Sequence, residues 1–198
     1  MIYAGLREIR CSSDVILAAS QFHVSLENLK GIFMRILVAY MSVTGNTKKV
    51  AEAIYDVITE EKEIRDLKEL ESLEGYDLIF LGFPIHDFGP PKQAKSFIEK
   101  HAGGKTLAMF VTHGAPETME DVQDWLATCK IEADQCDILG IFNCQGEIAE
   151  EILDFIKGSN QPKLQSFAKF AHLTKGLPNE EHLNKAKDFA SKIVQQIS

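Results

Sequence analysis

The sequence of 198 residues lacks long apolar runs and clusters of basic residues. Its longest apolar runs, near residues 78–83 and 107–111, are far shorter than the roughly 20 residues that a helix needs to cross a bilayer. The net charge is −8, and no stretch rich in Lys or Arg alternates with aromatic residues. Because nucleic acid and anionic membranes attract basic surfaces, we expect a soluble protein with no nucleic-acid and no membrane partner. An acidic surface instead suits basic protein partners.

Cysteine is scarce and follows no recognisable motif. The four cysteines, Cys11, Cys129, Cys136 and Cys144, make no CxxC pair and no zinc-binding spacing. Cysteines of this kind fit small buried side chains in a reducing compartment better than a disulfide framework. We therefore expect a cytoplasmic protein without a metal site.

Several catalytic motifs are also missing. The sequence has no GxxxxGKS/T pattern, and no GxGxxG follows any apolar run, which argues against a P-loop and against a dinucleotide-binding turn. We find no Ser-His-Asp, Cys-His or paired-carboxylate arrangement. The sequence therefore indicates no catalytic side chain.

Residues 1–33 differ from the rest of the chain. They lack the regions of a secretory signal, and their charges cancel: Arg7, Arg10 and Lys30 against Glu8, Asp14 and Glu27. Met34 directly precedes the first strong strand pattern, and Lys30-Gly31 requires purine-rich codons like those of a bacterial ribosome-binding site. Two interpretations stay open: translation begins at Met34, or residues 25–29 belong to a genuine N-terminal helix. We expect residues 1–33 to be an extension and residues 34–198 to form one domain.

Residues 34–198 alternate short apolar runs with amphipathic stretches. The runs predict five strands, over residues 35–40, 63–66, 77–83, 106–112 and 137–143. Apolar residues at helical spacing predict helices over residues 47–59, 92–100, 119–129 and 179–196. This alternation is typical of an α/β fold in which helices cover both faces of a parallel sheet.

Residues 146–176 are extra relative to a minimal five-strand unit. They contain an amphipathic set, a break at residues 158–162 and a second short helix through Phe167. The amphipathic set consists of Ile148, Ile152, Phe155 and Ile156. We expect this insertion to cover the sheet edge, meet a partner or shape a substrate pocket.

The strongest chemical signal is the loop after the first strand, which consists of Ser42, Val43, Thr44, Gly45, Asn46 and Thr47. A helix N-terminus presents unpaired N–H groups and a favourable dipole to a phosphate. Hydroxyl and amide side chains add donors, and Gly45 lets the backbone come close. No Lys or Arg lies within the loop, so dipoles would hold the phosphate, which argues against a nucleoside triphosphate. The alternative is that these residues only cap a helix and form a turn.

At this loop the sequence resembles the flavodoxin family, whose phosphate loop reads roughly S/T-x-T-G-N-T. The match comprises Ser42, Thr44, Gly45, Asn46 and Thr47, and the resemblance extends from Met34 to the C-terminus. It implies a flavodoxin-like three-layer αβα sandwich, with a parallel sheet in the order 2-1-3-4-5, that binds one FMN non-covalently.

Ligands of doubly wound sheets bind where the strand order switches, here at the carboxyl ends of the first, third and fourth strands. The resemblance implies that two loops at these ends surround the flavin ring. They are Phe83, Pro84, Ile85, His86, Phe88 and Gly89 after the third strand, and Thr112, His113, Gly114 and Ala115 after the fourth. Many flavodoxins carry a Trp in the first loop and a Tyr in the second, and this chain has neither. We therefore expect one open ring face and a weaker affinity for FMN.

Single residues in and near these loops allow more than one interpretation. Phe83, Phe88 or His86 could stack on the ring, although a Phe at a strand end commonly belongs to the core. His113 either donates to the flavin O2 region or lies in solvent. Trp125, the single tryptophan, is expected to serve packing or an interface rather than to contact the flavin.

The resemblance implies an electron-transfer protein that carries electrons from a reductase or ferredoxin-like donor to an acceptor enzyme, with its oligomeric state left open. Two alternatives stay open: an NAD(P)H-dependent FMN oxidoreductase of quinones or flavins, and an interaction module that has lost its cofactor. The lack of a basic cluster for a nicotinamide phosphate argues against the first, and the intact loop at residues 42–47 argues against the second.

Overall fold

The computed structural model describes residues 34–160, 165, 168–169 and 171–197. The expected N-terminal extension, Cys11 and most of the short helix through Phe167 lie outside these residues. Within the described ranges, no helix combines the length and hydropathy that a membrane span requires.

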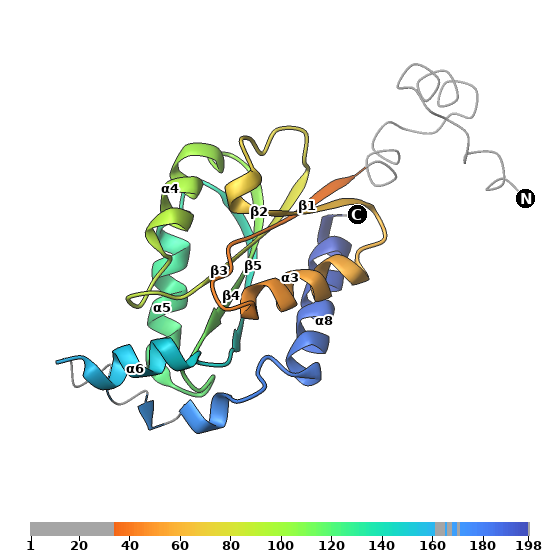
Figure 1. Ribbon diagram of the computed structural model, residues 1–198. Helices are drawn as coiled ribbons and strands as arrows, with labels where there is room; N and C mark the ends of the chain where they lie inside the picture. The colour runs from red at the N-terminus through yellow and green to blue at the C-terminus, as the bar shows by residue number, and fades with distance from the viewer. Residues whose placement is uncertain (1–33, 161–164, 166–167, 170, 198) are drawn as a thin grey trace, which may run out of the picture.

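A five-stranded parallel sheet forms the centre of the molecule (Figure 1). Its strands are β1 (Arg35–Tyr40), β2 (Glu61–Asp66), β3 (Leu78–Pro84), β4 (Thr106–His113) and β5 (Asp137–Gln145). They lie in the order β2-β1-β3-β4-β5, which confirms the predicted doubly wound fold. β1 pairs with both β2 and β3, so the switch in strand order falls beside β1 and the loops after β1, β3 and β4 meet at one end of the sheet.

The central strands and the edge strand β2 differ in their burial. β3 is buried over its first six residues, because helices cover both of its faces, and an apolar run suits that environment. β2 begins two residues earlier than predicted, since its opening residues Glu61 and Lys62 are charged and hide the strand pattern. An ion pair supports this start: the Arg35 guanidinium lies 2.8 Å from the Glu61 carboxylate, on neighbouring strands.

Two helices pack on each face of the sheet (Figure 1). α3 (Asn46–Val57) and α8 (Glu180–Ile197) bury residues such as Val50, Ile54 and Ile193 against one face. α4 (Lys92–His101) and α5 (Glu120–Ile131) bury residues such as Ile98 and Val122 against the other. The four predicted helices are thus present, with ends shifted by one or two residues, the usual uncertainty of helix boundaries.

The insertion contributes the helix α6 (Glu150–Gly158) and the short 3-10 helix η3 (Ala171–Thr174). In Figure 1, α6 lies below α5, at the carboxyl end of the sheet. The expectation that this segment covers a sheet edge therefore does not describe α6, which instead lies over the loops that follow the strands.

Candidate functional site

The loop between β1 and α3 presents the start of α3 to the carboxyl end of the sheet. Gly45 precedes the helix with φ of 91°, in the left-handed region that glycine adopts without strain. Ser42 Oγ accepts from the N–H groups of Gly45 and Lys48, at 3.1 and 3.3 Å, and so fixes the turn. The first N–H groups of a helix have no partner within it, so this end of α3 has donors and a positive dipole for an anion.

Thr47 joins this loop to β4. Its hydroxyl lies 2.9 Å from the hydroxyl of Thr112, and both side chains are buried, with 1% and 3% of their surface exposed. Either hydroxyl can be the donor. Thr44, by contrast, is exposed on the loop.

Asn46 joins the same loop to the segment after β5. Its Nδ2 donates to the Glu147 carbonyl at 2.8 Å. Gly146 passes so close that a Cβ there would lie 2.6 Å from Asn46 Nδ2. One amide hydrogen of Asn46 therefore serves the protein, which leaves the other for a ligand.

A tight turn at residues 86–89 follows β3. The N–H of His86 donates to the Gly89 carbonyl at 2.9 Å, and the N–H of Gly89 donates back to His86 at 3.0 Å. Asp87 and Phe88 have φ of 46° and 67°, and a large residue such as Phe is uncommon in this region. The ring of Phe88 packs on Trp125, with centroids 5.6 Å apart, which holds the turn in place.

His113 is buried at the end of β4. Its Nδ1 lies 3.0 Å from the Ala115 carbonyl, and its Nε2 lies 3.0 Å from Asn143 Oδ1. The Ala115 carbonyl can only accept, so Nδ1 carries a hydrogen toward it. Burial lowers the pKa of His113, against opposing effects of Asn143, Ala115 and the charge of Glu117. Of the two alternatives for His113, the one in which it lies in solvent is therefore wrong.

These loops and α6 enclose a cavity of about 530 Å³, within the usual range for small-molecule sites. The sequence-predicted residues that line it are Val43, Thr44, Asn46, Thr47, Pro84, Ile85, His86, Phe88, Thr112, His113, Gly114 and Ala115.

Four predicted residues lie apart from the cavity lining: Ser42, Gly45, Phe83 and Gly89. Ser42 and Gly45 shape the turn behind the lining residues. Phe83 is fully buried in the core on the side of α4 and α5, so its ring is not available for stacking. A Cβ at Gly89 would lie 3.1 Å from Thr128 of α5, which indicates a packing role.

Eight residues of the cavity wall were not among the predicted site residues, although six of them belong to the insertion for which a substrate pocket was one expected role: Asp87, Trp125, Gly146, Glu147, Ile148, Ile152, Phe155 and Ile156. Trp125 was expected to serve packing or an interface rather than to contact the flavin. It is buried and also lines the cavity, in edge contact with the ring of His113. The signal was available, because α5 starts at the carboxyl end of the sheet and its inward-facing first turns must lie near the loops.

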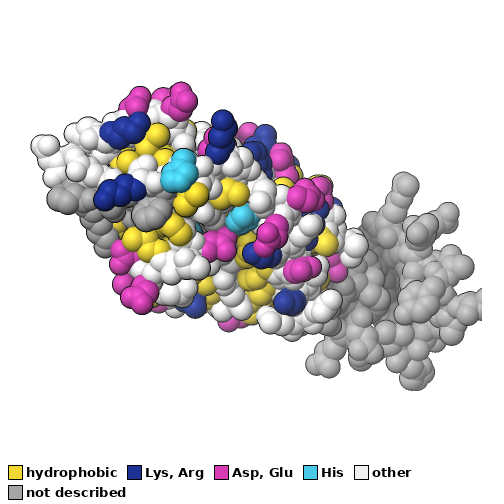
Figure 2. Space-filling model, turned by 90° about the horizontal axis from the view of Figure 1, so that it is seen from below, with side chains coloured by type: hydrophobic (Ala, Val, Ile, Leu, Met, Phe, Trp, Pro, Cys, Tyr) yellow, Lys and Arg dark blue, Asp and Glu magenta, His cyan; other side chains and the backbone are white. Residues whose placement is uncertain are grey.

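The charged groups of the cavity wall are acidic. Asp87 and Glu147 line it, and no Lys or Arg of the described residues does so. The remaining wall is mainly apolar, and Figure 2, which looks onto this end of the molecule, shows hydrophobic side chains among the charged ones. Such a cavity suits a flat apolar group next to a phosphate that hydrogen-bond donors hold.

Comparison with known proteins identifies relatives of this chain. A family model described as a flavodoxin domain matches residues 37–191. The flavodoxin-like domain-containing protein BilS of Clostridioides difficile is 37% identical over 157 residues, which cover 76% of this chain and 80% of that protein. A solved short-chain flavodoxin associated with a bacterial microcompartment shares the fold, with a TM-score of 0.56, 13% identity and coverage of 84% of this chain and 100% of its own. A flavodoxin from the domain Archaea gives a TM-score of 0.54 at 16% identity, over 83% and 99% of the two chains.

Proposed function

This chain belongs to the flavodoxin family, and from that premise we propose that it binds one FMN in the 530 Å³ cavity and carries electrons between redox proteins. The observation that carries the proposal is that one cavity combines hydrogen-bond donors for a phosphate with an apolar wall for a flat ring. Thr44, Asn46 and Thr47 bring the start of α3 to it, and apolar side chains of three other segments complete the wall.

The residues present fit FMN at both of its ends. The loop at residues 42–47 has hydroxyl, amide and backbone donors for a phosphate. A Cβ built on Gly45 would meet no atom within 4 Å, so the space beside this backbone is empty. The loops after β3 and β4 place Pro84, Ile85 and Ala115 on the wall, where a flat ring could pack. Bound FMN would supply the one- and two-electron chemistry, while the protein binds and orients it.

The protein's own groups set the surroundings of the ring. His113 is held by Ala115 and Asn143 in a fixed orientation, with a lowered pKa that favours the neutral ring. Asp87 and Glu147 on the wall oppose added negative charge. We propose a reductase or ferredoxin-like donor and an acceptor enzyme as partners in the cytoplasm.

The test is titration of the purified protein with FMN and with riboflavin, which lacks the phosphate, followed by quenching of flavin fluorescence. Thr44→Ala removes a hydroxyl donor to the phosphate, and charge-assisted hydrogen bonds of about 1.5–3 kcal/mol predict at least a ten-fold weaker FMN complex. Riboflavin binding should not change. Thr118→Ala, an exposed threonine that does not line the cavity, is the matched control.

Failure of the wild-type protein to quench either flavin would contradict the proposal and favour the interaction module without cofactor. Equal FMN affinity of Thr44→Ala and wild type would place the phosphate elsewhere.

A second candidate is an NAD(P)H-dependent FMN oxidoreductase on the same fold. It is favoured by the insertion, which extends the cavity wall beyond the loops after β1, β3 and β4 with Ile148, Ile152 and Phe155. The absence of Lys and Arg from the described cavity wall argues against a nicotinamide phosphate site. Addition of NADPH to the FMN-loaded protein separates the two: rapid loss of the flavin's visible absorbance without a reductase would favour the enzyme.

A further inference from the structure

α6 presents an apolar stripe that faces the cavity. Ile152, Phe155 and Ile156 line the cavity, at the spacing of one helical face. Phe155 and Ile152 are nevertheless 70% and 38% exposed. Exposed apolar side chains that gather beside a cavity, unlike single exposed ones, are typical of a ligand or partner site.

Hydrogen bonds fix the start of the insertion to the end of β4 and to the loop between β1 and α3. The N–H of Gly146 donates to the His113 carbonyl at 2.9 Å, and Asn46 Nδ2 donates to the Glu147 carbonyl at 2.8 Å. Ile148 packs directly on Gly114, where a Cβ would lie 2.7 Å from its Cγ1. The helix that follows is therefore positioned by the same loops that would hold the cofactor.

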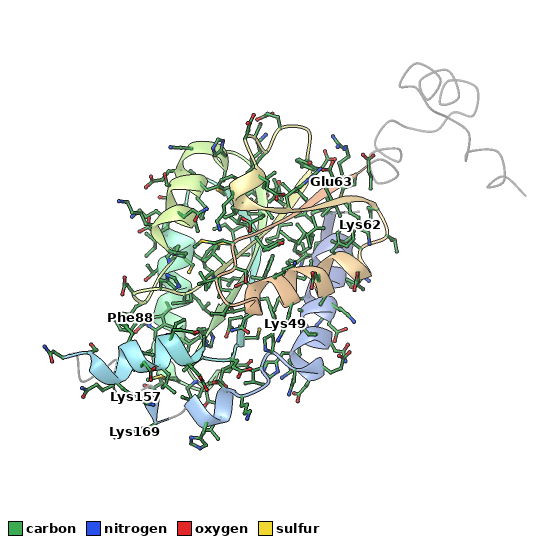
Figure 3. All side chains as sticks on the ribbon, viewed as in Figure 1. Lys49, Lys62, Glu63, Phe88, Lys157 and Lys169 are labelled. Atoms are coloured by element: carbon green, nitrogen blue, oxygen red, sulfur yellow. The ribbon has the colours of Figure 1, made fainter. Side chains whose placement is uncertain are left out.

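The cavity wall already contains two aromatic side chains, Phe88 and Trp125. Phe88 and Trp125 pack on each other, and Figure 3 shows Phe88 where the lower end of α5 meets α6. Beyond His113, the residues after β4 on the cavity wall are Gly114 and the buried Ala115, and neither has a large side chain. A flat ring seated in the cavity needs a second apolar surface, and α6 has exposed apolar side chains on the cavity wall.

We infer that α6 is the outer wall of the flavin site and that Phe155, supported by Ile152, packs on the bound isoalloxazine ring. This inference rests on the proposed function. It assigns the shielding of the ring to an inserted helix in a chain that has no Phe, Tyr or Trp between His113 and Met119.

The test compares FMN and riboflavin affinities of Phe155→Ala with those of wild type. Loss of an aromatic packing surface predicts a roughly five- to ten-fold weaker complex with both flavins, because Phe155 would contact the ring and not the phosphate. Ile131→Ala is the control, since Ile131 is 69% exposed on α5 and does not line the cavity. The exposure of Phe155 means that the variant should fold, which circular dichroism checks.

Phe155→Trp supplies a second readout that needs no turnover. The added indole should keep wild-type flavin affinity, and its red-shifted emission should be quenched in proportion to bound FMN. Equal flavin affinity of Phe155→Ala and wild type would overturn the inference while leaving the proposed function intact. A self-association that Phe155→Ala abolishes in sedimentation, with unchanged flavin affinity, would also overturn it, because a second copy would then be the occupant. A wild-type protein that binds neither flavin would instead overturn the proposed function.

Discussion

The paired hydroxyl groups of Thr47 and Thr112 tie the phosphate loop to the end of β4. Both are almost fully buried and lie 2.9 Å apart. A buried hydroxyl that loses its partner keeps its desolvation penalty, whereas removal of both partners leaves no unpaired group. The pair therefore decides how firmly α3 is held at the site, independently of any cofactor.

Substitution of one member of this pair should destabilise the cofactor-free protein by more than the energy of the lost hydrogen bond, because the remaining hydroxyl stays buried without a partner. Thr47→Val keeps the shape and leaves the Thr112 hydroxyl unpaired, so we expect a loss of about 1–3 kcal/mol in the free energy of unfolding. The double variant Thr47→Val with Thr112→Val should lose less than the sum of the two single variants. Urea denaturation measures all four proteins, and additive losses would mean that the hydroxyls do not interact.

His113 makes a prediction about pH. Its pKa in the folded protein lies below the ordinary value of 6.5, because burial disfavours the charged ring. As pH falls below the ordinary value of 6.5, the unfolded chain takes up a proton that the folded protein does not yet bind. The contribution of His113 to stability is therefore fully present above pH 6.5 and decreases below it. The carboxylates with a resolved shift, Glu63 and Glu181, have lowered pKa values and act at lower pH.

His113→Gln should remove this pH dependence. Between pH 7.5 and 5.5 the wild type is expected to lose more free energy of unfolding than the variant, by at most about 1.4 kcal/mol per pH unit. Urea denaturation at the two pH values gives the comparison. Parallel losses in both proteins would show that His113 titrates as it does in the unfolded chain.

At the scale of elements, the contact between Gly82 of β3 and Phe110 of β4 leaves no room for a side chain on Gly82. Gly82 and Phe110 are partners in the register, and a Cβ on Gly82 would lie 2.0 Å from the ring. Gly82→Ala must therefore displace the buried Phe110, and we expect a loss of roughly 3 kcal/mol in the free energy of unfolding. Gly103→Ala is the matched control, since a Cβ there meets nothing within 4 Å, and its effect should stay within about 0.5 kcal/mol. Thermal or urea unfolding compares the two variants.

The elements that could be predicted from sequence are those whose pattern is local. β1 was predicted with its observed bounds, Arg35–Tyr40, because its apolar run is buried on both faces. β2 was predicted two residues short, since Glu61 and Lys62 join the sheet through backbone pairing with β1, and the exposed ion pair of Glu61 with Arg35 adds little. Side-chain pattern alone carries no information about such a partner on another strand.

The site residues, like the strands, could be predicted only where the sequence pattern is local. The loops after β1, β3 and β4 were predicted because each follows a recognisable strand and the fold brings the strand ends together. For residues 146–176 a pocket was only one of three expected roles, and no residue of this segment was a predicted site residue, since the bond from Asn46 to Glu147 joins residues 101 positions apart. Ile148 and Phe155 looked like an ordinary amphipathic stripe, and only the packed chain shows that this stripe faces the cavity and not the sheet.

At the scale of the whole molecule, charge and site architecture act against each other. The chain has a net charge of −8, and FMN brings a phosphate dianion. No Lys or Arg lies between residues 42 and 47. Lys48 and Lys49 follow on the first turn of α3, both exposed (Figure 3 labels Lys49), and the Lys48 ammonium lies 3.8 Å from Glu52. We therefore expect dipoles to hold the phosphate in a field that repels it.

The dependence of FMN affinity on salt tests this balance. Added salt shortens the Debye length to about 10 Å at 0.1 M and so screens the long-range repulsion, whereas the short hydrogen bonds of the loop are screened much less. Between about 0.02 and 0.5 M NaCl the FMN complex should keep its affinity or become up to about two-fold tighter. Riboflavin has no phosphate charge, so its affinity should stay constant and serves as the control in the same titrations. The expectation would be contradicted if salt weakened the FMN complex several-fold but left the riboflavin complex unchanged. Cationic side chains such as Lys48 or Lys49 would then hold the phosphate, and the dipoles of α3 alone would be insufficient.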